Sequence, residues 1–346
     1  MRDAGQAEVA RWDDLVVANA DGGQILQSRA WGEFKRAHRW RPRYLISEAD
    51  TPLAVLMLRH SVPGLGELGY IPKGPGVAGV DQLGLVIDEL RDSAGRAFAI
   101  KIEPEIEQSE SAVGALRGIG LEKSRHDVQI SRATIIVDLR PDEDALLASF
   151  KPKCRYNIRL AQRHGVIVEP VPLDAGSIET MYDLMASTRD RAGFTLRSKD
   201  YCSGYWRLHA AAGQGQLFFA SLGGTVLAGV FATYMGTKAW YKDGGSTKEH
   251  AAVMAPHLLQ WEVMRWLKER GVGAYDLVAV PPADRLTPEH PLFGLYRFKS
   301  GFSERITEYV GTWDLPIRRS RYAAWHRVAE RAAHQWSYRV RHDLLY

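Results

Sequence analysis

The order of secondary-structure elements expected along this chain repeats once, and this repeat limits the folds that the chain can adopt. Each half begins with a helix and continues with short apolar or alternating runs, a turn rich in Gly or Pro, a second helix and a final strand. In the first half these elements are expected at 25–36, 43–47, 54–58, 69–76, 82–96 and 98–102. In the second half they are expected at 178–192, 217–222, 225–234, 239–244, 254–270 and 275–280. No sequence identity is visible between the halves, but a duplicated α/β fold explains the shared order.

The boundary between the halves is expected near the acidic start of a new helix. Asp142, Glu143 and Asp144 suit the first turn of a helix, and Lys151-Pro152 ends it. We therefore expect a first domain at residues 1–141 and a second domain at 142–314. A C-terminal helix at 315–346 is expected to complete the first domain, because its apolar residues recur at helical spacing.

Composition is that of an ordinary globular chain of 346 residues, 45% hydrophobic and 25% charged. The apolar run Leu53–Leu58 has only the length of a strand, well short of the roughly 20 residues that cross a bilayer. Residues 1–14 lack the pattern of a signal peptide. Cys154 and Cys202 match no zinc or redox spacing, so free thiols in the cytoplasm are expected.

The net charge of +4 is distributed unevenly along the chain. Residues 318–346 contain seven arginines against two acids, and residues 151–163 contain basic residues and no acid. Such patches favour polyanions, either nucleic acid, nucleotide-linked substrates or an anionic membrane surface. An ordinary solvated helix face is the alternative for either patch alone. The C-terminal helix could also contact the inner face of a membrane.

The segment Pro291–Phe302 places Lys299 among aromatic residues and beside Gly301. A lysine held against rings is a poorly hydrated point charge, which suits an oxyanion or a phosphate. Gly301 is expected to let the backbone approach a ligand closely. The structural alternative is a lysine that lies over core aromatics with its ammonium group in water.

Other polar residues fall at positions that suit binding. Lys35 lies next to the apolar side of the helix that carries Trp31, and Lys73 lies on a Pro/Gly loop. Glu103 and Glu105 follow a strand, where turn acids are the simpler explanation. The segment with Thr195, Arg197 and Tyr201 is a donor-rich loop suited to phosphates or carboxylates.

Familiar catalytic motifs are missing from the sequence. It contains no Gly-x-Ser-x-Gly elbow, Walker A loop, dinucleotide fingerprint or His-Glu-x-x-His. Residues 217–280 suit an acetyltransferase-type fold, yet residues 246–254 lack the Gly-x-Gly that would cradle a coenzyme A pyrophosphate. This favours an acyl donor other than acyl-CoA.

Several motifs in the right order together resemble the Fem (FemABX) family of peptidoglycan-bridge aminoacyltransferases. They are Leu26-Gln-Ser with Trp31 and Lys35; Ile71-Pro-Lys-Gly-Pro75; Lys101-Ile-Glu-Pro104; Lys153-x-Arg-Tyr-Asn-Ile-Arg-x-Ala161; Thr195-x-Arg-x-x-x-Tyr201; Tyr241-x-Asp-Gly-Gly-Ser246; Tyr275-Asp276; and Phe298-Lys-Ser-Gly-Phe302 with Tyr309-Val-Gly. The resemblance implies two tandem acetyltransferase-like (GNAT-type) domains. No long heptad segment interrupts the second domain, so the coiled-coil arm of some members is expected to be absent.

The resemblance also implies a reaction. An amino acid (glycine, alanine or serine) would pass from aminoacyl-tRNA to the stem-peptide amine of a peptidoglycan precursor, either lipid II or UDP-MurNAc-pentapeptide. No cofactor and no metal is implied. Two other readings stay open: the same transfer to a small metabolite, and a non-catalytic module that binds tRNA or membrane.

Roles for individual residues follow from the resemblance alone. The precursor-binding positions are Lys35, Trp31, Lys73, Thr195, Arg197 and Tyr201. Tyr241 and Lys299 would lie near the reacting ester, with Lys299 stabilising the oxyanion. Glu103 stands where the family often has aspartate, so its acid/base role stays open. Lys153, Arg155 and Arg159 are candidate contacts for tRNA phosphates.

Overall fold

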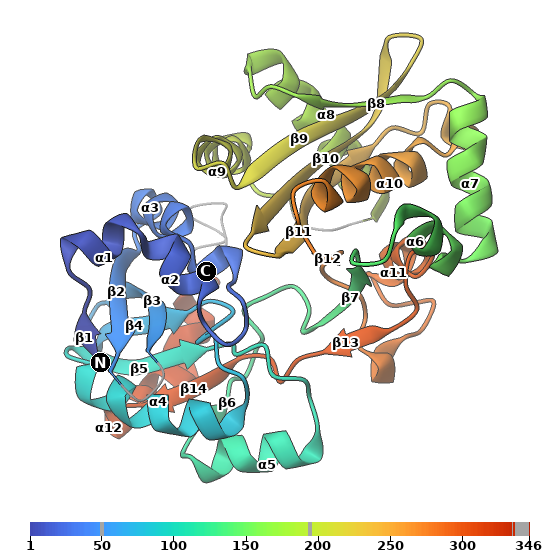
Figure 1. Ribbon diagram of the computed structural model, residues 1–346. Helices are drawn as coiled ribbons and strands as arrows, with labels where there is room; N and C mark the ends of the chain where they lie inside the picture. Colours follow the sequence, from blue (N-terminus) through green and yellow to red (C-terminus); the bar gives the residue numbers. More distant parts are fainter. Residues whose placement is uncertain (49–51, 193–195, 334, 336–345) are drawn as a thin grey trace. The chain divides into compact units, whose positions relative to one another are not determined.

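The structure is a computed structural model that describes residues 1–48, 52–192, 196–333, 335 and 346 (Figure 1). The chain forms two compact units: residues 1–132 together with 308–346, and residues 133–307. The domain boundaries expected after residues 141 and 314 therefore lie C-terminal to the observed boundaries, which follow residues 132 and 307. The first differs because β7 (Ala133–Asp138) pairs with β12 (Ala274–Asp276) of the second unit. The second differs because β14 (Trp313–Pro316) pairs with β5 (Ala97–Ile102) of the first.

The first unit contains a seven-stranded sheet with the order β1-β2-β3-β4-β5-β14-β6. Its other strands are β1 (Arg2–Asp3), β2 (Arg41–Ser47), β3 (Leu53–Val62), β4 (Gly66–Ile71) and β6 (Glu122–Lys123). Strands β2, β3 and β4 form an antiparallel meander, β4 and β5 are parallel, and β14 is antiparallel to β5. Figure 1 shows β14, in red, among the blue and cyan strands of this sheet.

Helices of the first unit pack on this sheet through alternate side chains of its strands. Val55 and Met57 of β3 join a core cluster with Leu83 and Ile87 of α4. Ser28 caps α3 by accepting a hydrogen bond from the Trp31 backbone at 3.1 Å. The helical elements are α1 (Gln6–Ala10), α2 (Trp12–Val17), η1 (Ile25–Gln27), α3 (Arg29–Ala37), α4 (Val80–Ser93), α5 (Glu110–Gly118), α12 (Arg319–Ala324) and η4 (Trp325–Ala329).

The C-terminal segment packs back onto the first unit, as predicted. Trp325 contacts Phe98 with ring centroids 5.7 Å apart. Below it, the buried Lys101 ammonium lies 2.9 Å from both Asp314 and Glu330. This buried ionic cluster joins β5, β14 and the tail. The tail positions Trp336 and Val340, expected on the same helix face, lie outside the described residues.

The second unit repeats the pairing of the first. Its sheet has the order β13-β7-β12-β11-β10-β9-β8, with β8 (Ile167–Val171), β9 (Gly215–Leu222), β10 (Thr225–Met235), β11 (Lys238–Ser246) and β13 (Ile306–Glu308). Strands β8 to β11 are antiparallel, β11 and β12 are parallel, and β7 is antiparallel to β12. Counted from β1 in the first sheet and from β8 in the second, the fourth and fifth strands of each sheet form a parallel pair, which is the pattern of a duplicated fold.

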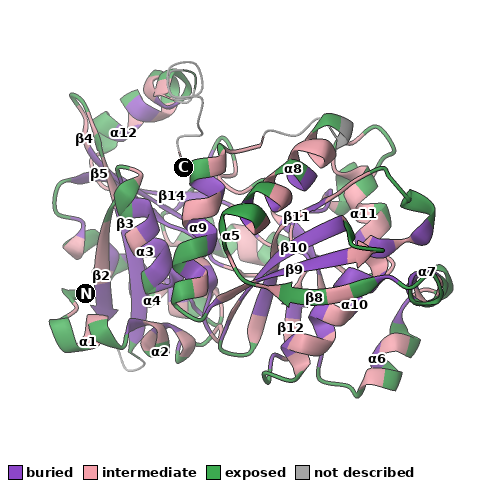
Figure 2. Cartoon of the chain, turned by 90° about the horizontal axis from the view of Figure 1, so that it is seen from above, coloured by how far each residue is buried: buried purple, intermediate pink, exposed green. Residues whose placement is uncertain are grey.

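The parallel pair has the same cause in both units. A crossover helix connects the two strands, α4 in the first unit and α10 (Ala255–Lys268) in the second. Figure 2 shows that the strands are largely buried, as expected for sheets covered by helices. The remaining helical elements of the second unit are α6 (Glu143–Ser149), α7 (Pro152–Arg163), α8 (Ala175–Ala192), α9 (Lys199–Ala211), η2 (Ala251–Val253), η3 (Ala283–Arg285) and α11 (Phe293–Lys299).

The structure corrects two local predictions in this unit. The strand predicted at 275–280 ends at Asp276, because Val278 has φ 59° and leaves the extended conformation. Tyr201 lies in α9 rather than on a loop.

The longest helix of the described residues is α8, with 18 residues, so this part of the chain contains no coiled-coil arm. Cys154 and Cys202 are both buried thiols. Among the described residues, no helix is long and apolar enough to cross a membrane.

Candidate active site

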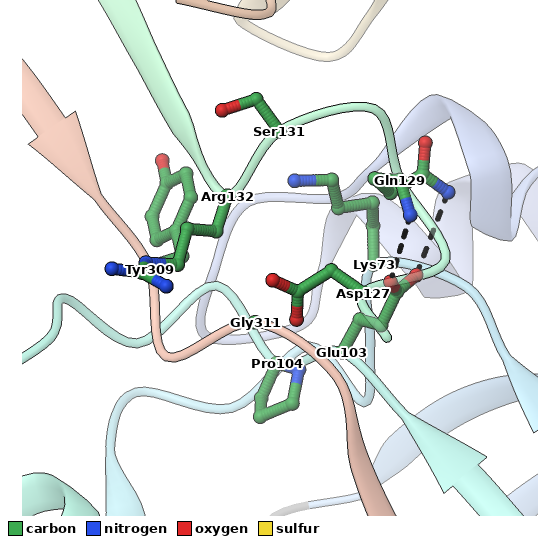
Figure 3. A pocket seen from close by; sticks show the side chains of 9 residues that line it. All are labelled: Lys73, Glu103, Pro104, Asp127, Gln129, Ser131, Arg132, Tyr309 and Gly311. Atoms are coloured by element: carbon green, nitrogen blue, oxygen red, sulfur yellow. Dashed lines mark hydrogen bonds between the residues drawn. The ribbon is translucent and has the colours of Figure 1, made fainter. Parts of the chain in front are cut away.

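The first unit has a small pocket at the edge where its two parallel strands end. Ile71 of β4 pairs with Ile102 of β5, so the residues that follow both strands are neighbours. The Glu103 backbone donates a hydrogen bond of 2.9 Å to the Gly74 carbonyl. The pocket has a volume of about 250 Å³, part of it open to solvent. Its lining residues, shown in Figure 3, are Lys73, Glu103, Pro104, Asp127, Gln129, Ser131, Arg132, Tyr309 and Gly311.

Glu103 is the buried carboxylate of this pocket, only 4% exposed. The Tyr70 hydroxyl donates to one of its oxygens at 2.5 Å, and the Thr312 hydroxyl donates to the other at 2.7 Å. Gln129 adds two longer contacts, drawn as dashed lines in Figure 3. Burial and the neighbouring Glu103 charge raise the pKa of Tyr70 well above its usual value, so Tyr70 remains a donor. The carboxylate is therefore held rigidly in one orientation.

Asp127 brings a second carboxylate to the pocket. It accepts hydrogen bonds from the Thr312 backbone at 2.8 Å and from the Lys123 ammonium at 3.0 Å. Burial alone would raise the pKa of Asp127, but these two donors outweigh it and lower the pKa below its usual value. Asp127 is thus ionised at neutral pH.

Two cations lie beside these carboxylates. Lys73, on the loop after β4, lies 3.5 Å from Glu105 and 5.1 Å from the ring centroid of Tyr309. The Arg132 guanidinium lies 3.7 Å from Glu308. Lys73 and Glu103, both predicted site residues, are therefore brought together in one pocket. Asp127 and Arg132 are missed by sequence reasoning, because they lie on a connecting segment without a periodic pattern. Tyr309 is named there only as part of the Tyr309-Val-Gly motif, without a role in the site.

Lys35 and Trp31 lie together on α3, as their spacing predicts. The Lys35 ammonium lies 5.2 Å from the centroid of the Trp31 ring, and both residues are buried. A lysine that is only 2% exposed is unusual, because burying an ammonium group is costly. Lys35 is thus not an ordinary surface lysine.

In the second unit, Lys299 lies at the end of α11 and is only 4% exposed. Its ammonium group donates to the carbonyls of Val278 and Ala279 at 2.8 and 3.0 Å. It also lies 5.7 Å from the centroid of the Tyr241 ring. Burial lowers the pKa of Lys299 to about 7, although the charge of Asp276 acts in the opposite direction. The ammonium and the neutral amine are therefore both populated near neutral pH.

Tyr241 is packed closely against the Gly-Gly pair that follows it in β11. A Cβ atom at Gly244 would collide with the Tyr241 ring, and one at Gly245 would lie 2.5 Å from the Leu184 carbonyl oxygen of α8. Burial, followed by the charge of Asp243, raises the pKa of Tyr241 to about 12. The two glycines thus let β11 carry a half-buried, neutral tyrosine beside Lys299.

Gly301 serves packing rather than the ligand approach expected from the sequence. A Cβ atom at Gly301 would lie 3.1 Å from the Phe298 carbonyl oxygen and 3.2 Å from Cys154 Cβ. The close approach is therefore to α7, which carries Cys154.

Arg197 and Tyr201 contact each other, with the guanidinium 4.5 Å from the ring centroid. The Tyr182 hydroxyl fixes the backbone here by donating to the Arg197 carbonyl at 3.1 Å. Thr195, the third member of this predicted group, lies outside the described residues.

The basic helix α7 presents part of its predicted surface to solvent. Lys153 and Arg159 are exposed, whereas Arg155 donates to the Ala148 carbonyl at 3.0 Å and to the Phe150 carbonyl. Arg155 thus closes the end of α6. Exposed Tyr156 lies between cations, with Lys153 5.0 Å and Arg163 5.8 Å from its ring centroid. Tyr156 and Arg163 extend the predicted basic surface.

The chain has the fold of two tandem acetyltransferase-like units, which confirms the predicted fold class. It superimposes on the crystal structure of FemX with a TM-score of 0.83 and 22% identity, covering 94% of this chain and 100% of that one. The FemAB family model matches residues 14–219 and 207–330. This protein therefore belongs to the FemAB family, as the sequence motifs indicate.

Curated relatives agree with this membership. The lipid II:glycine glycyltransferases of Staphylococcus aureus strains MRSA252 and USA300 are each 23% identical over 399 residues, which cover 92% of this chain and 94% of each relative. Because that stretch exceeds the 346 residues of this chain, the relatives contain additional residues within it. Because these relatives are glycyltransferases, they confirm the predicted enzyme class, an acyltransferase.

Proposed function

We propose that this protein transfers glycine, alanine or serine from aminoacyl-tRNA to the stem-peptide amine of a peptidoglycan precursor, either lipid II or UDP-MurNAc-pentapeptide. The observation that carries the proposal is the match to the FemAB family across both units. Relatives named lipid II:glycine glycyltransferase, matched over nearly their whole length, support the choice of acceptor.

The pocket of the first unit suits the acceptor. An alkylammonium group, with a pKa of about 10.4, must lose a proton before it attacks. Glu103 and Asp127 provide carboxylates that attract such a group. Glu103 is held by Tyr70 and Thr312, so it can orient an amine without rearrangement. We infer that Glu103 binds the acceptor amine and Lys73 contacts the same substrate, with Lys35, Trp31, Arg197 and Tyr201 as further precursor contacts.

The transfer needs no nucleophile from the enzyme. The amine nitrogen attacks the ester carbonyl carbon and forms a tetrahedral intermediate with an oxyanion. Collapse of the intermediate breaks the bond to the ribose oxygen, which takes a proton as the nitrogen loses one. The Lys299 ammonium is proposed to stabilise the oxyanion. An ammonium has three donors, and two contact carbonyls, so its orientation is fixed in advance. The Tyr241 ring lies beside this ammonium, with its centroid 5.7 Å away.

The second unit favours a tRNA donor over acyl-CoA. Acyl-CoA enzymes of this fold use backbone N–H groups before the crossover helix to bind pyrophosphate, and a proline lacks this group. Here α10 has Pro256 in its first turn, after His250 and Met254 with φ of 51° and 59°. The exposed face of α7 instead offers Lys153, Arg159 and an aromatic ring, which suits a nucleic-acid backbone.

The test is transfer from a pool of radiolabelled aminoacyl-tRNAs to purified lipid II and to UDP-MurNAc-pentapeptide. Label on either precursor is expected, and it identifies both the amino acid and the acceptor. Glu103→Gln, which keeps the size of the side chain, should raise KM for the acceptor far more than KM for the donor. Intact ester with no labelled precursor would contradict the proposal, and equal effects on both KM values would contradict the role of Glu103.

A further inference from the structure

The pocket of the first unit contains equal numbers of positive and negative groups. Lys73 and Arg132 line it together with Glu103 and Asp127, so the formal charges of the lining cancel. The pocket is small, and its volume of about 250 Å³ includes space open to solvent. A neutral apolar group would make no charge-assisted contact with these four side chains. The lining therefore suits a small group that carries both signs of charge.

Each of the four charged groups is also held from outside the pocket. The supporting contacts are Lys73 with Glu105 at 3.5 Å, Asp127 with Lys123 at 3.0 Å, Arg132 with Glu308 at 3.7 Å, and Glu103 with the Tyr70 hydroxyl at 2.5 Å. These contacts fix the side chains before a ligand arrives, which lowers the entropic cost of binding. Figure 3 shows the charged side chains arranged around the same space.

We propose that this pocket recognises a carbon atom that carries both an amine and a carboxylate. This inference rests on the proposed function and specifies its acceptor: the third residue of the stem peptide is a diamino diacid such as diaminopimelate, rather than lysine. Glu103 and Asp127 contact the amine, and Lys73 and Arg132 contact the carboxylate on the same carbon. The amine is the one that receives the amino acid.

The other groups that the proposed reaction brings to the protein lack one of the two charges. The donor aminoacyl group has an amine, but its carboxyl group is esterified. The end of the stem peptide has a carboxylate without an amine. A lysine side chain has an amine alone, and its ammonium would lie beside two cations without a carboxylate between them. Only the end of a diamino diacid matches both halves of the pocket.

The experiment compares nucleotide-linked precursors that differ only in the third residue: diaminopimelate, lysine, and diaminopimelate with its side-chain carboxylate amidated. The full-length protein is assayed with the pool of labelled aminoacyl-tRNAs. We expect kcat/KM for diaminopimelate to exceed the other two by about 10- to 100-fold, the usual effect of a hydrogen bond to a charged group. Equal use of diaminopimelate and lysine would overturn the inference and leave the proposed function intact.

Variants assign the preference to this pocket. Lys73→Met and Arg132→Met should each reduce the ratio of diaminopimelate to lysine by about tenfold. Arg117→Met, on the exposed surface of α5 in the same unit, is the control and should leave the ratio unchanged. A ratio that survives in both pocket variants would refute the assignment.

Binding of the same precursors, measured without donor, tests the pocket even if no transfer occurs. The Kd for the diaminopimelate precursor should be at least tenfold lower than for the lysine precursor. Equal Kd values would overturn the inference. A preference in binding without any transfer would support the pocket and contradict the proposed function.

Discussion

The lowered pKa of Lys299 makes a specific prediction for the pH dependence of transfer. Burial lowers this pKa from 10.5 to about 7. If the Lys299 ammonium stabilises the oxyanion, the rate depends on the product of two fractions: protonated Lys299 and neutral acceptor amine. The first falls about tenfold per pH unit above 7. The second rises about tenfold per unit up to about 10, the usual pKa of an alkylamine.

The two dependences cancel above pH 7. We therefore expect log kcat/KM for the acceptor to rise with unit slope below pH 7 and to become flat between 7 and 8.5. Lys299→Met removes the break, so its unit slope should continue through pH 8.5. At pH 7 this variant should be about a hundredfold slower, the usual effect of losing one oxyanion contact. The deficit should then shrink about tenfold by pH 8.

The assay is steady-state transfer of labelled amino acid to a saturating series of precursor, with donor in excess, between pH 6 and 8.5. A wild-type slope that stays at one through pH 7 would refute the ammonium role. A slope of two below pH 7 and one above it would instead assign Lys299 as a base that acts in its neutral form. Relative to the rate at pH 7, the flat profile lies about tenfold below the other two at pH 8, and the slope of two separates the third outcome by about tenfold at pH 6.

Unfolding measurements check the lowered pKa independently. Because the folded pKa of Lys299 lies below the unfolded value, the unfolded state binds more protons between pH 7 and 10.5. The destabilisation by this buried ammonium is thus fully present below pH 7 and disappears as pH rises to 10.5. Relative to Lys299→Met, the free energy of unfolding of the wild type should increase by up to about 5 kcal/mol between pH 7 and 10.5. An unchanged difference in unfolding free energy would show that the pKa is not lowered.

Three further predictions concern the donor surface and the cores. Lys153→Ala should raise KM for aminoacyl-tRNA and reduce its salt dependence by about one unit of log–log slope, whereas an unchanged slope would exclude phosphate contact. Lys101→Met leaves two buried carboxylates without their cation, so chemical denaturation should show a loss of about 3–5 kcal/mol; a loss below 1 kcal/mol would contradict the cluster. Gly245→Ala forces a Cβ against the Leu184 backbone and should destabilise by about 1–3 kcal/mol. Gly114→Ala, which meets nothing within 4 Å on α5, is its control and should be neutral or stabilising.

The sequence predicts the local elements of both units but not how they complete each sheet. The meander of β9, β10 and β11 follows from alternating residues and tight turns, signals that lie within a few residues. The place of β14 beside β5 depends instead on contacts such as Lys101 with Asp314, 213 residues apart. No local pattern encodes such a pairing, and both domain boundaries are displaced for this reason.

Some residues of the candidate site can likewise be placed from the sequence, whereas others cannot. Lys73 and Glu103 can be placed together from the sequence, because each follows a strand of the parallel pair. Asp127 and Arg132 reach the pocket only through the segment before β7, and Tyr309 only through the chain that returns to β14. The sequence shows which residues these are, but their positions around one pocket depend on how the sheet is completed.

Duplication explains why the two units can carry opposite chemistry at equivalent positions. In each unit, the functional residues lie just beyond the end of the strand that follows the crossover helix. In the first unit this position is Glu103, a carboxylate fixed by hydroxyl donors. In the second unit the chain turns at Val278, and its carbonyl binds the ammonium of Lys299. A reaction that joins an amine to an activated ester needs one group to bind the incoming cation and another to stabilise the oxyanion that forms. In the proposed reaction, the first unit supplies the carboxylate of Glu103 and the second unit supplies the ammonium of Lys299.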